Sequence, residues 1–376
     1  MKIAIRVDSS FEIGSGHVMR CLVLAQYLQK KSCEVCFLSR EHDGNLIEYI
    51  KSKGFKVFLL PKRKLCAEVN QSSDAVNTGW LGCSQDNDAI ECLEVIENFN
   101  PNWLIVDHYS IDKKWETILK NEQMKIMVID DLANREHNCE LLLDQNYYNN
   151  PYKRYDNLVP NYCTKLLGPQ FSLLRDEFFK IDSKKIRNVN NIFKIFIFMG
   201  SSDITNQTLK VVKSIVSLIQ KGFLLSVDVL VGEINPNSNQ IRSYCDKYSE
   251  IRFIGGTSEI SKMMLEANIA IGAGGSASLE RCYLGLPSLV ISVAENQVET
   301  TNSLNSFGAI YHLGWFQNVN ENMISTQIEK FMRAPNLLNS MSQKATSIFK
   351  VNGSKSKLGV EYIYDLLLNK IDIDKE

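Results

Sequence analysis

The stretch Ser9-Ser10-Phe11-Glu12-Ile13-Gly14-Ser15-Gly16-His17-Val18-Met19-Arg20 joins the first strand that the sequence predicts to the first helix. The strand, residues 2–7, is short, apolar and rich in β-branched side chains, and the helix begins at about Gly16 with apolar residues at helical spacing. Gly14 and Gly16 allow a tight turn and a close approach of the backbone to a ligand. The stretch therefore predicts a strand, a turn and a helix, the opening unit of an α/β fold.

His17 falls in the first turn of this predicted helix. The free N–H groups and the positive dipole end of a helix attract anions there and favour the neutral imidazole, which can accept a proton. A histidine in a first turn is also often a surface residue or a helix cap, so the motif needs support from the rest of the chain. We expect His17 to be catalytic and Gly14, Ser15 and Gly16 beside it to bind substrate.

The composition is typical of a globular protein without a general affinity for nucleic acid. The 376 residues suffice for two domains of ordinary size, and 44% are hydrophobic and 23% charged. The net charge of -1 offers no basic field to a nucleic acid. Met1 leads into a strand without the features of a signal peptide, and no apolar run nears the roughly 20 residues that span a bilayer. We therefore expect a cytoplasmic protein without nucleic-acid or membrane partners, and its oligomeric state stays open.

Strands and helices alternate through the first half of the chain. Further strands are predicted at residues 34–39, 56–60, 103–107, 125–129 and 141–144, with helices at 45–53, 89–99 and 113–121, and residues 62–88 predict a long polar loop. This alternation predicts a doubly wound parallel sheet, whose ligands bind beyond the carboxyl ends of the strands. Tyr109 and Asp130 follow such ends, as His17 does, so we expect these residues to converge.

A second alternating series follows a charged segment at residues 182–191, which predicts a linker. Strands are predicted at 193–198, 224–231, 251–254, 268–271 and 286–292, and helices at 205–220, 238–248, 260–267, 321–333, 337–349 and 360–368. The chain thus predicts two doubly wound, Rossmann-like domains, residues 1–187 with the catalytic histidine and residues 188–376. The cleft between two such domains is the natural place for a ligand.

A second glycine turn, Gly272-Ala-Gly-Gly-Ser276, follows a strand and opens a helix that Ser276 is expected to cap. Free backbone N–H groups in such a turn can face a diphosphate. The turn matches neither the nucleotide-triphosphatase pattern nor the dinucleotide pattern. We expect Gly274, Gly275 and Ser276 to bind an anionic substrate.

Three polar residues follow on the same rim. Glu280, one turn into the helix, can accept hydrogen bonds from two ribose hydroxyls, although an acid there also complements the helix dipole. Asn296 and Gln297 open another helix and are expected to bind substrate, although Asn296 alone would be a helix cap.

Metal and redox sites are weakly indicated. Cys33 and Cys36 form a single C-x-x-C inside a predicted strand and fit core residues better than zinc ligands. Asp107, Asp130 and Asp131 stand at strand ends, where paired acids bind a divalent ion or serve hydrogen bonding. We expect neither a metal nor a cofactor.

Taken in order, these motifs closely resemble one family, the UDP-2,4-diacetamido-2,4,6-trideoxy-β-L-altropyranose hydrolases of pseudaminic acid biosynthesis, which implies a GT-B-like α/β fold. The second glycine turn also resembles that of the enzyme that transfers N-acetylglucosamine to the lipid precursor of peptidoglycan. Residues 199–202 replace a more glycine-rich turn, and residues 351–355 lack a glycine and an arginine of the family pattern. The matching pieces are residues 6–10, 14–20, 107–109, 129–134, 142–146, 167–171, 174–175, 199–203, 272–282 and 294–297.

The resemblance implies that water removes UDP from a 6-deoxy diacetamido sugar, in a pathway that supplies flagellin glycosylation. By this resemblance His17 positions or deprotonates the water, Tyr109 and Asn296 orient substrate and diphosphate, and Glu280 holds the uridine ribose. A transferase on the same fold, with an acceptor hydroxyl in place of water, would bind the same UDP-sugar. A nucleotide-sugar-binding module without turnover is a third interpretation.

Overall fold

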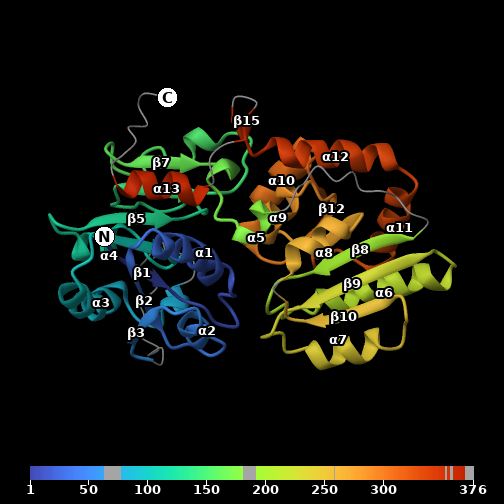
Figure 1. Cartoon of the computed structure of the whole chain (residues 1–376), viewed down its shortest axis with the longest axis horizontal. Coiled ribbons are helices and arrows are strands. Elements are labelled where there is room, and N and C mark those ends of the chain that lie inside the picture. The colour runs from blue at the N-terminus through green and yellow to red at the C-terminus, as the bar shows by residue number, and fades with distance from the viewer. Residues whose placement is uncertain (63–77, 181–191, 258, 352–353, 356–358, 369–376) are drawn as a thin grey trace. The chain divides into compact units, whose positions relative to one another are not determined.

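The computed structural model describes residues 1–62, 78–180, 192–257, 259–351, 354–355 and 359–368 (Figure 1). The chain divides into two compact units, each built on its own sheet. The first contains Met1–Asn146, Asn150–Leu173 and the C-terminal helix, and the second contains Tyr147–Asn149 and the chain from Leu174 to Lys355. The expected linker lies outside the described residues, as does most of the loop expected at 62–88.

The first unit holds a parallel sheet whose seven described strands run in the order β3-β2-β1-β4-β5-β6-β7. These strands are β1 (Lys2–Val7), β2 (Glu34–Arg40), β3 (Lys56–Leu60), β4 (Trp103–Asp107), β5 (Lys125–Ile129), β6 (Leu141–Asp144) and β7 (Thr164–Leu167). The connecting helices are α1 (Gly16–Lys30), α2 (Ile47–Ser52), α3 (Gln85–Phe99) and α4 (Lys113–Leu119), with short 3-10 turns η1 (Thr78–Leu81), η2 (Pro151–Lys153) and η3 (Pro169–Phe171). The sequence predicted all of these strands except β7.

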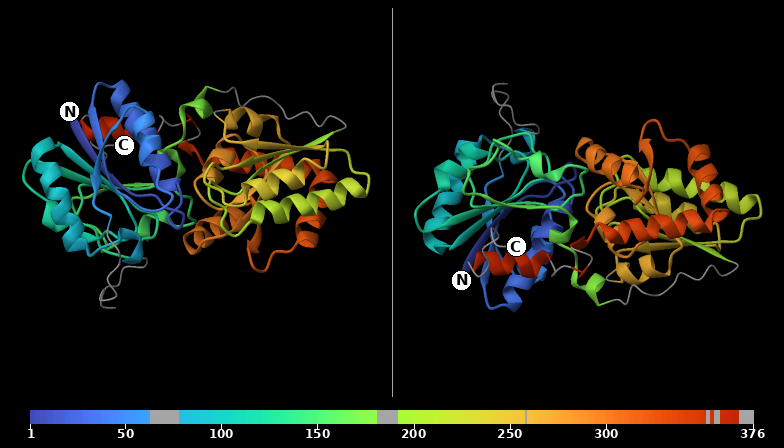
Figure 2. Two further views of the ribbon diagram at one scale, coloured as in Figure 1. Left: turned by 90° about the horizontal axis from the view of Figure 1, so that it is seen from below. Right: turned by 90° about the horizontal axis from the view of Figure 1, so that it is seen from above.

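Alternation along the strands places apolar side chains on both faces of this sheet, because successive strand residues point to opposite sides. Ile3 and Ile5 of β1 pack with residues of α1, whereas Ala4 between them packs with Ala89 of α3 and Trp115 of α4. Helices therefore cover both faces, as Figure 2 shows. The doubly wound architecture expected from the sequence is confirmed.

The last described helix, α13 (Gly359–Leu367), belongs to the first unit. It packs against α1 (Figure 1), and the Trp103 indole N–H donates a hydrogen bond to the Leu367 carbonyl at 3.1 Å. Val360, Ile363 and Leu367 are buried in the same core cluster as α1. The division expected at residue 187 leaves out this return, because a helical period shows that a helix has an apolar face but not which sheet covers that face.

The second unit repeats the plan with a parallel sheet whose six described strands run in the order β10-β9-β8-β11-β12-β13. The strands are β8 (Phe193–Phe198), β9 (Leu225–Val231), β10 (Ile251–Gly255), β11 (Ile269–Ala273), β12 (Ser288–Ser292) and β13 (Tyr311–Trp315), and β14 (Lys350–Val351) and β15 (Ser354–Lys355) form a separate hairpin. The helices are α5 (Asp176–Phe179), α6 (Gln207–Gln220), α7 (Ser238–Cys245), α8 (Ile260–Glu266), α9 (Ala277–Tyr283), α10 (Val298–Phe307), α11 (Glu321–Met332) and α12 (Pro335–Ser347), with the turn η4 (Glu295–Gln297). The sequence missed β13.

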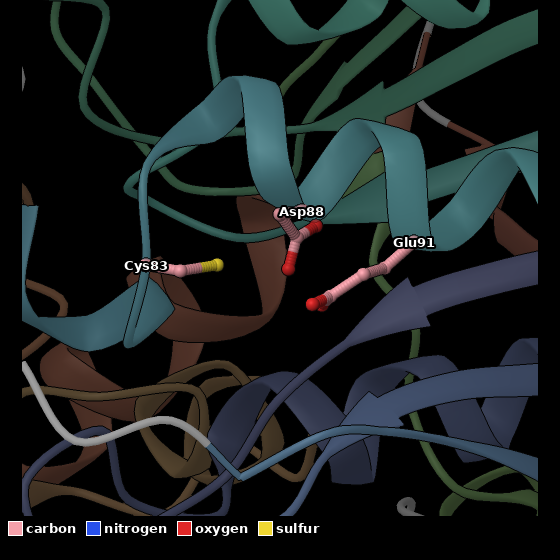
Figure 3. A group of neighbouring side chains, drawn as sticks. All are labelled: Cys83, Asp88 and Glu91. Carbon is pink, nitrogen blue, oxygen red and sulfur yellow. The ribbon is translucent and has the colours of Figure 1, made fainter.

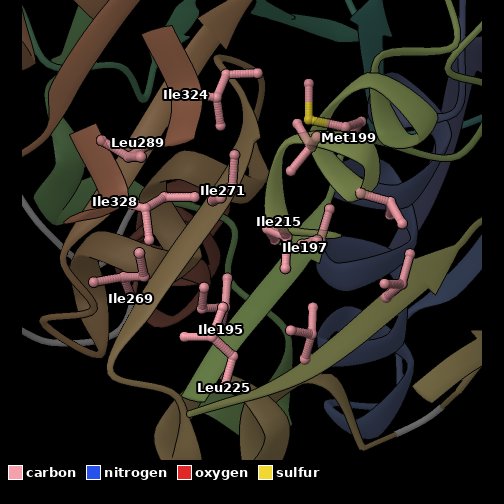
Figure 4. Packing of buried hydrophobic residues seen from close by; sticks show 14 of the residues in the cluster. Ile195, Ile197, Met199, Ile215, Leu225, Ile269, Ile271, Leu289, Ile324 and Ile328 are labelled. Carbon is pink, nitrogen blue, oxygen red and sulfur yellow. The ribbon is translucent and has the colours of Figure 1, made fainter. Parts of the chain in front are cut away.

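The core of the second unit has the same two-sided pattern. Ile195 and Ile197 of β8 point to the face covered by α6 and α11, and Figure 4 shows Ile197 next to Ile215 of α6. Phe196 between them packs on the other face with Met263 of α8. Both sheets are therefore fixed by buried side chains on either side, which holds their strand ends in place.

Candidate functional site

The sheet order of the first unit defines a switch point between β1 and β4, where neighbouring strands feed connections that run to opposite sides. The turn after β1 leads to His17, and β4 ends at Asp107. Val7 pairs with Asp107 in the register of these two strands. Two segments far apart in the sequence thus meet at one edge of the sheet, as expected.

A tight turn delivers His17 to this edge. The Ser10 hydroxyl oxygen accepts hydrogen bonds from the N–H groups of Glu12 and Ile13 at 3.1 and 2.9 Å, and the Ser10 carbonyl accepts from Gly14 N–H at 2.9 Å. Gly14 has a φ of +78°, which a side chain would strain. Gly14 is therefore needed for the turn, and Ser15 and Gly16 continue it into α1.

His17 forms a close pair with Asp107. Its Nδ1 lies 2.6 Å from an Asp107 carboxylate oxygen, and both side chains are buried. An ionised carboxylate only accepts hydrogen bonds, so Nδ1 carries a proton, and in the neutral imidazole Nε2 is the acceptor. This is the state in which an imidazole can take a proton from water.

Arg20, one turn after His17, completes a charged network. Its guanidinium donates to both oxygens of Asp107 at 2.6 Å and to Asp131 at 3.1 Å. Burial alone would raise the pKa of Asp107, but the charges and hydrogen bonds of Arg20 and His17 outweigh it and hold that pKa well below its ordinary value. Asp107 therefore stays an anion beside the imidazole.

Tyr109 supports the imidazole rather than standing open to solvent. Its ring meets the His17 ring edge-on at a centroid distance of 4.5 Å, and its hydroxyl donates to Asp131 at 2.5 Å. Trp80 of η1 stacks on its other side, and only 3% of Tyr109 is exposed. Burial and the Asp131 charge raise the pKa of Tyr109 well above its ordinary value, so the phenol keeps its proton.

The sequence predicts no role for Arg20, and it indicates Asp107 and Asp131 only as metal ligands or hydrogen-bonding acids. Arg20 is three residues beyond His17, so both lie on one helix face. Asp107 ends β4, and Asp131 lies two residues after the neighbouring strand β5. Those spacings are the signal that could have found them. Asp130, in contrast, faces Arg135 at 2.8 Å instead of joining His17.

The acidic residues considered for a metal are engaged by arginines. Arg20 holds Asp107 and Asp131, and Arg135 holds Asp130, whose pKa is lowered to about 2 against the effect of burial.

Among the described residues, the ligand-type side chains that come within reach of one ion are Cys83, Asp88 and Glu91, which point toward one another in Figure 3. The Arg40 guanidinium lies 2.6 Å from both carboxylates, and Arg6 also contacts Asp88 at 2.8 Å. A guanidinium already supplies the positive charge that a metal ion would bring. The cluster therefore fits a buried ion-pair network.

The second unit has its own switch point between β8 and β11. The glycine turn follows β11, and the turn at residues 199–203 follows β8. A Cβ on Gly232, just after β9, would lie 2.3 Å from the Ser201 backbone, so this second turn packs closely on its neighbour. The carboxyl ends of three strands thus form one rim.

Gly274, Gly275 and Gln297 meet on this rim. A Cβ on Gly274 would lie 2.5 Å from Thr301 Oγ1 and 3.1 Å from Gln297 Cβ, whereas a Cβ on Gly275 would lie 3.8 Å from the Gln297 amide nitrogen. Gly275 and Ser276 are exposed, as is Asn296 in η4. Ser276 precedes α9 but its side chain makes no capping hydrogen bond in the described structure, so the expected cap is wrong.

Glu280 is held by an arginine from another segment. Arg175 donates to its two carboxylate oxygens at 2.8 and 2.9 Å, a bidentate geometry. The sequence motif containing Arg175 did not reveal this partner, because the two residues are 105 positions apart. The ion pair fixes the orientation of the Glu280 carboxylate, which keeps further lone pairs as acceptors.

Comparison with known proteins finds similarity over most of the chain. No protein-family model matches it. It is 29% identical to the UDP-2,4-diacetamido-2,4,6-trideoxy-β-L-altropyranose hydrolase of Campylobacter jejuni over 309 residues. The aligned region covers 82% of this chain and 97% of that protein. No helix in the described ranges combines the length and apolar character that crossing a membrane requires.

Solved structures agree on the fold. MurG of Acinetobacter baumannii superposes with a TM-score of 0.64 at 12% identity, covering 98% of this chain and 99% of that one. Spinosyn rhamnosyltransferase SpnG, complexed with thymidine diphosphate, gives 0.62 at 14% identity and covers 97% and 99%. The chain thus has a GT-B-like α/β fold, and the resemblance to the UDP-diacetamido-trideoxy-altropyranose hydrolases, expected from its motifs, is confirmed by similarity over most of its length.

Proposed function

We propose that this protein is an enzyme that hydrolyses a UDP-linked 2,4-diacetamido-2,4,6-trideoxy sugar to the free sugar and UDP, as a step of pseudaminic acid biosynthesis. The observation that carries the proposal is the buried pair of His17 and Asp107 at the switch point of the first sheet. The similarity to a named hydrolase of that substrate supports the choice of sugar.

In the proposed reaction, His17 acts on water. Nε2 accepts a proton from the water as its oxygen forms a bond to the anomeric carbon of the sugar, and the bond from that carbon to the phosphate oxygen breaks. UDP leaves with the electron pair of that bond. Asp107 keeps Nδ1 protonated and stabilises the imidazolium that forms, and Tyr109 and Arg20 hold the pair in place. A diphosphate is a good leaving group, so one base suffices.

The second unit is proposed to bind the nucleotide. Gly274, Gly275 and Ser276 offer backbone N–H groups to the diphosphate, with Asn296 and Gln297 beside them. Gly274 has no room for a side chain because Thr301 and Gln297 pack against it, so the turn and the segment with Gln297 are held together on this rim.

The remaining proposed contacts are the ribose and the turn before His17. Glu280 accepts from the ribose hydroxyls with the lone pairs that Arg175 leaves. Gly14, Ser15 and Gly16 bind the substrate next to His17. One structural neighbour was solved with a nucleoside diphosphate, which supports a nucleotide role for this fold.

The test is incubation of the purified protein with the UDP-sugar and no acceptor. Release of free sugar and UDP in equal amounts at an enzymatic rate is the expected result. UDP-N-acetylglucosamine serves as a control for specificity. Binding of the UDP-sugar without release of either product would contradict the proposal.

A sugar transferase is the second candidate, because MurG and the rhamnosyltransferase SpnG share the fold. Such an enzyme would use the same imidazole to deprotonate an acceptor hydroxyl. It would release little free sugar until an acceptor is added, so the acceptor-free incubation separates the two functions.

A further inference from the structure

Arg281 of α9 is a buried cation that the reaction proposed above does not use. Only 1% of the residue is exposed, and two of its three guanidinium nitrogens, Nε and Nη1, have no hydrogen-bond partner among the described residues. Its third nitrogen, Nη2, donates to the Ala273 carbonyl and to the Ser278 hydroxyl oxygen, both at 2.8 Å. A buried charge normally has an opposite charge beside it, so this arrangement needs an explanation.

The described residues provide no ion-pair partner for Arg281. Glu280 is the adjacent acid in the sequence, but Arg175 already engages both of its carboxylate oxygens. Burial lowers the pKa of Arg281 to about 10, so the guanidinium remains charged at neutral pH. The second unit therefore keeps an uncompensated positive charge in its interior.

The guanidinium lies directly beneath the glycine turn. A Cβ on Gly272 would be 2.6 Å from Arg281 Nη1 and 2.6 Å from the Phe198 carbonyl, so Gly272 makes the space that Arg281 occupies. The neighbouring Gly274 is likewise too close to Thr301 to bear a side chain. Both glycines serve to bring backbone and buried polar groups together at the end of β11.

The contact with Ala273 links this charge to the surface of the turn. A peptide unit is planar and trans, so the Ala273 carbonyl and the N–H of Gly274 point in opposite directions. Arg281 and the Ser278 hydroxyl both donate to that carbonyl, which polarises the whole peptide unit. The N–H of Gly274, on the side away from Arg281, becomes a stronger donor to an anion.

We propose that Arg281 is a positioning residue for the diphosphate, which holds the Ala273 to Gly274 peptide and supplies a positive charge from beneath the glycine turn. The inference rests on the proposed nucleotide role of this turn. The diphosphate would be the counter-charge that the described residues lack, and water is a poorer one because it carries no net charge. Arg281 therefore favours charged nucleotides over the neutral nucleoside.

The test compares UDP with uridine, which lacks the diphosphate. Affinities of both ligands are measured by NMR titration for the wild type, Arg281→Gln and Arg281→Lys. Gln retains a donor for the Ala273 carbonyl but no charge, whereas Lys retains both. We expect Arg281→Gln to lower the affinity for UDP at least tenfold and the affinity for uridine less than twofold. Arg281→Lys should retain most of the preference for UDP over uridine. Arg252→Gln removes an exposed positive charge from the same unit and should change neither ligand.

The possible outcomes separate this inference from the proposed function. If Arg281→Gln loses affinity for UDP and for uridine by equal factors, the arginine has a purely structural role and the inference is overturned. Unchanged affinity for both ligands would also overturn it. Failure of the wild type to bind UDP would instead remove the proposed function on which the inference rests. If Arg281→Gln does not fold, Arg281→Lys is measured at pH 7 and pH 10.5 instead. Its preference for UDP over uridine should fall at pH 10.5, because the ammonium loses its proton, and an unchanged preference would overturn the inference.

Discussion

The two units have the same doubly wound plan but treat buried charge differently at their switch points. In the first unit, Arg20 is paired with Asp107 and Asp131, and these ion pairs fix the imidazole of His17. In the second unit, Arg281 has no carboxylate partner within the described structure and lies under a glycine turn. The comparison teaches that a buried arginine paired with carboxylates can orient a neighbouring side chain for proton transfer. A buried arginine without a carboxylate partner instead suits an anionic ligand.

Substitution of His17 should have the largest effect on turnover, because it removes the proposed base of the first unit. His17→Asn keeps a polar side chain but removes the proton acceptor, and we expect turnover to fall by about 10²–10⁴-fold, the usual contribution of a general base. UDP affinity should stay within twofold, because the proposed nucleotide contacts lie in the second unit. Steady-state kinetics measures turnover, and calorimetry measures the affinity for UDP. Turnover near the wild-type level would contradict the role of His17.

Asp107→Asn should have the next largest effect. The amide cannot enforce the Nδ1 proton on His17, and we expect turnover to fall by roughly 10²-fold or more. Arg20 also loses a buried partner, which should lower the free energy of unfolding by about 3 kcal/mol. Asp112→Asn on the surface turn before α4 is the control. Normal turnover together with normal stability would show that the pair does not orient the imidazole.

The glycine turn offers a matched pair of substitutions in the second unit. Gly274→Ala places a methyl group 2.5 Å from Thr301 Oγ1, so we expect UDP affinity to fall roughly tenfold, equivalent to about 1.4 kcal/mol. Gly275→Ala meets its first neighbour at 3.8 Å and should bind UDP nearly as the wild type does. Calorimetric titration measures both. The reverse order of affinities would argue against Gly274 as the close-approach position.

Asp144, a buried carboxyl group of the first unit, should affect stability rather than turnover. It is buried, and burial together with the Asp131 charge raises its pKa to about 8, although Arg154 lies 3.2 Å away. The folded state then holds a proton between pH 4 and pH 8 that the unfolded state, with a carboxyl pKa of about 3.9, has lost. Stability contributed by this group therefore falls as pH rises through that range.

Asp144→Asn should remove this slope, because an amide does not titrate. We expect the variant to gain stability relative to the wild type between pH 5 and pH 8, by a few kcal/mol at most. Urea dependence of hydrogen exchange in β6 reports on the first unit alone. Parallel pH profiles for the two proteins would show that Asp144 is ionised throughout the range.

Much of the fold could be predicted from sequence because most strands are short apolar runs that end in polar turns. The strands β7 and β13 were missed. Tyr311–Trp315 of β13 is only partly buried and contains a glycine, so its apolar signal is weak. The return of α13 to the first unit depends on contacts with α1 and Trp103, which no local pattern encodes.

The candidate site shows the same limit. The turns at residues 14–17 and 272–276 could be recognised, because glycine and the neighbouring strand and helix periods are local signals. The partners that decide their chemistry lie far away in the sequence, as Asp107 does from His17 and Arg175 does from Glu280. The unpaired charge of Arg281 could not be predicted either. It depends on which described side chains lie near the guanidinium, and the sequence does not show that.

The most direct measurement of the central claim is turnover of the UDP-sugar in ¹⁸O-labelled water, with both products analysed by mass spectrometry. If water attacks the anomeric carbon, the free sugar gains one ¹⁸O and UDP gains none. Label in UDP would show that water attacks phosphorus, and the account of His17 given above would then be wrong.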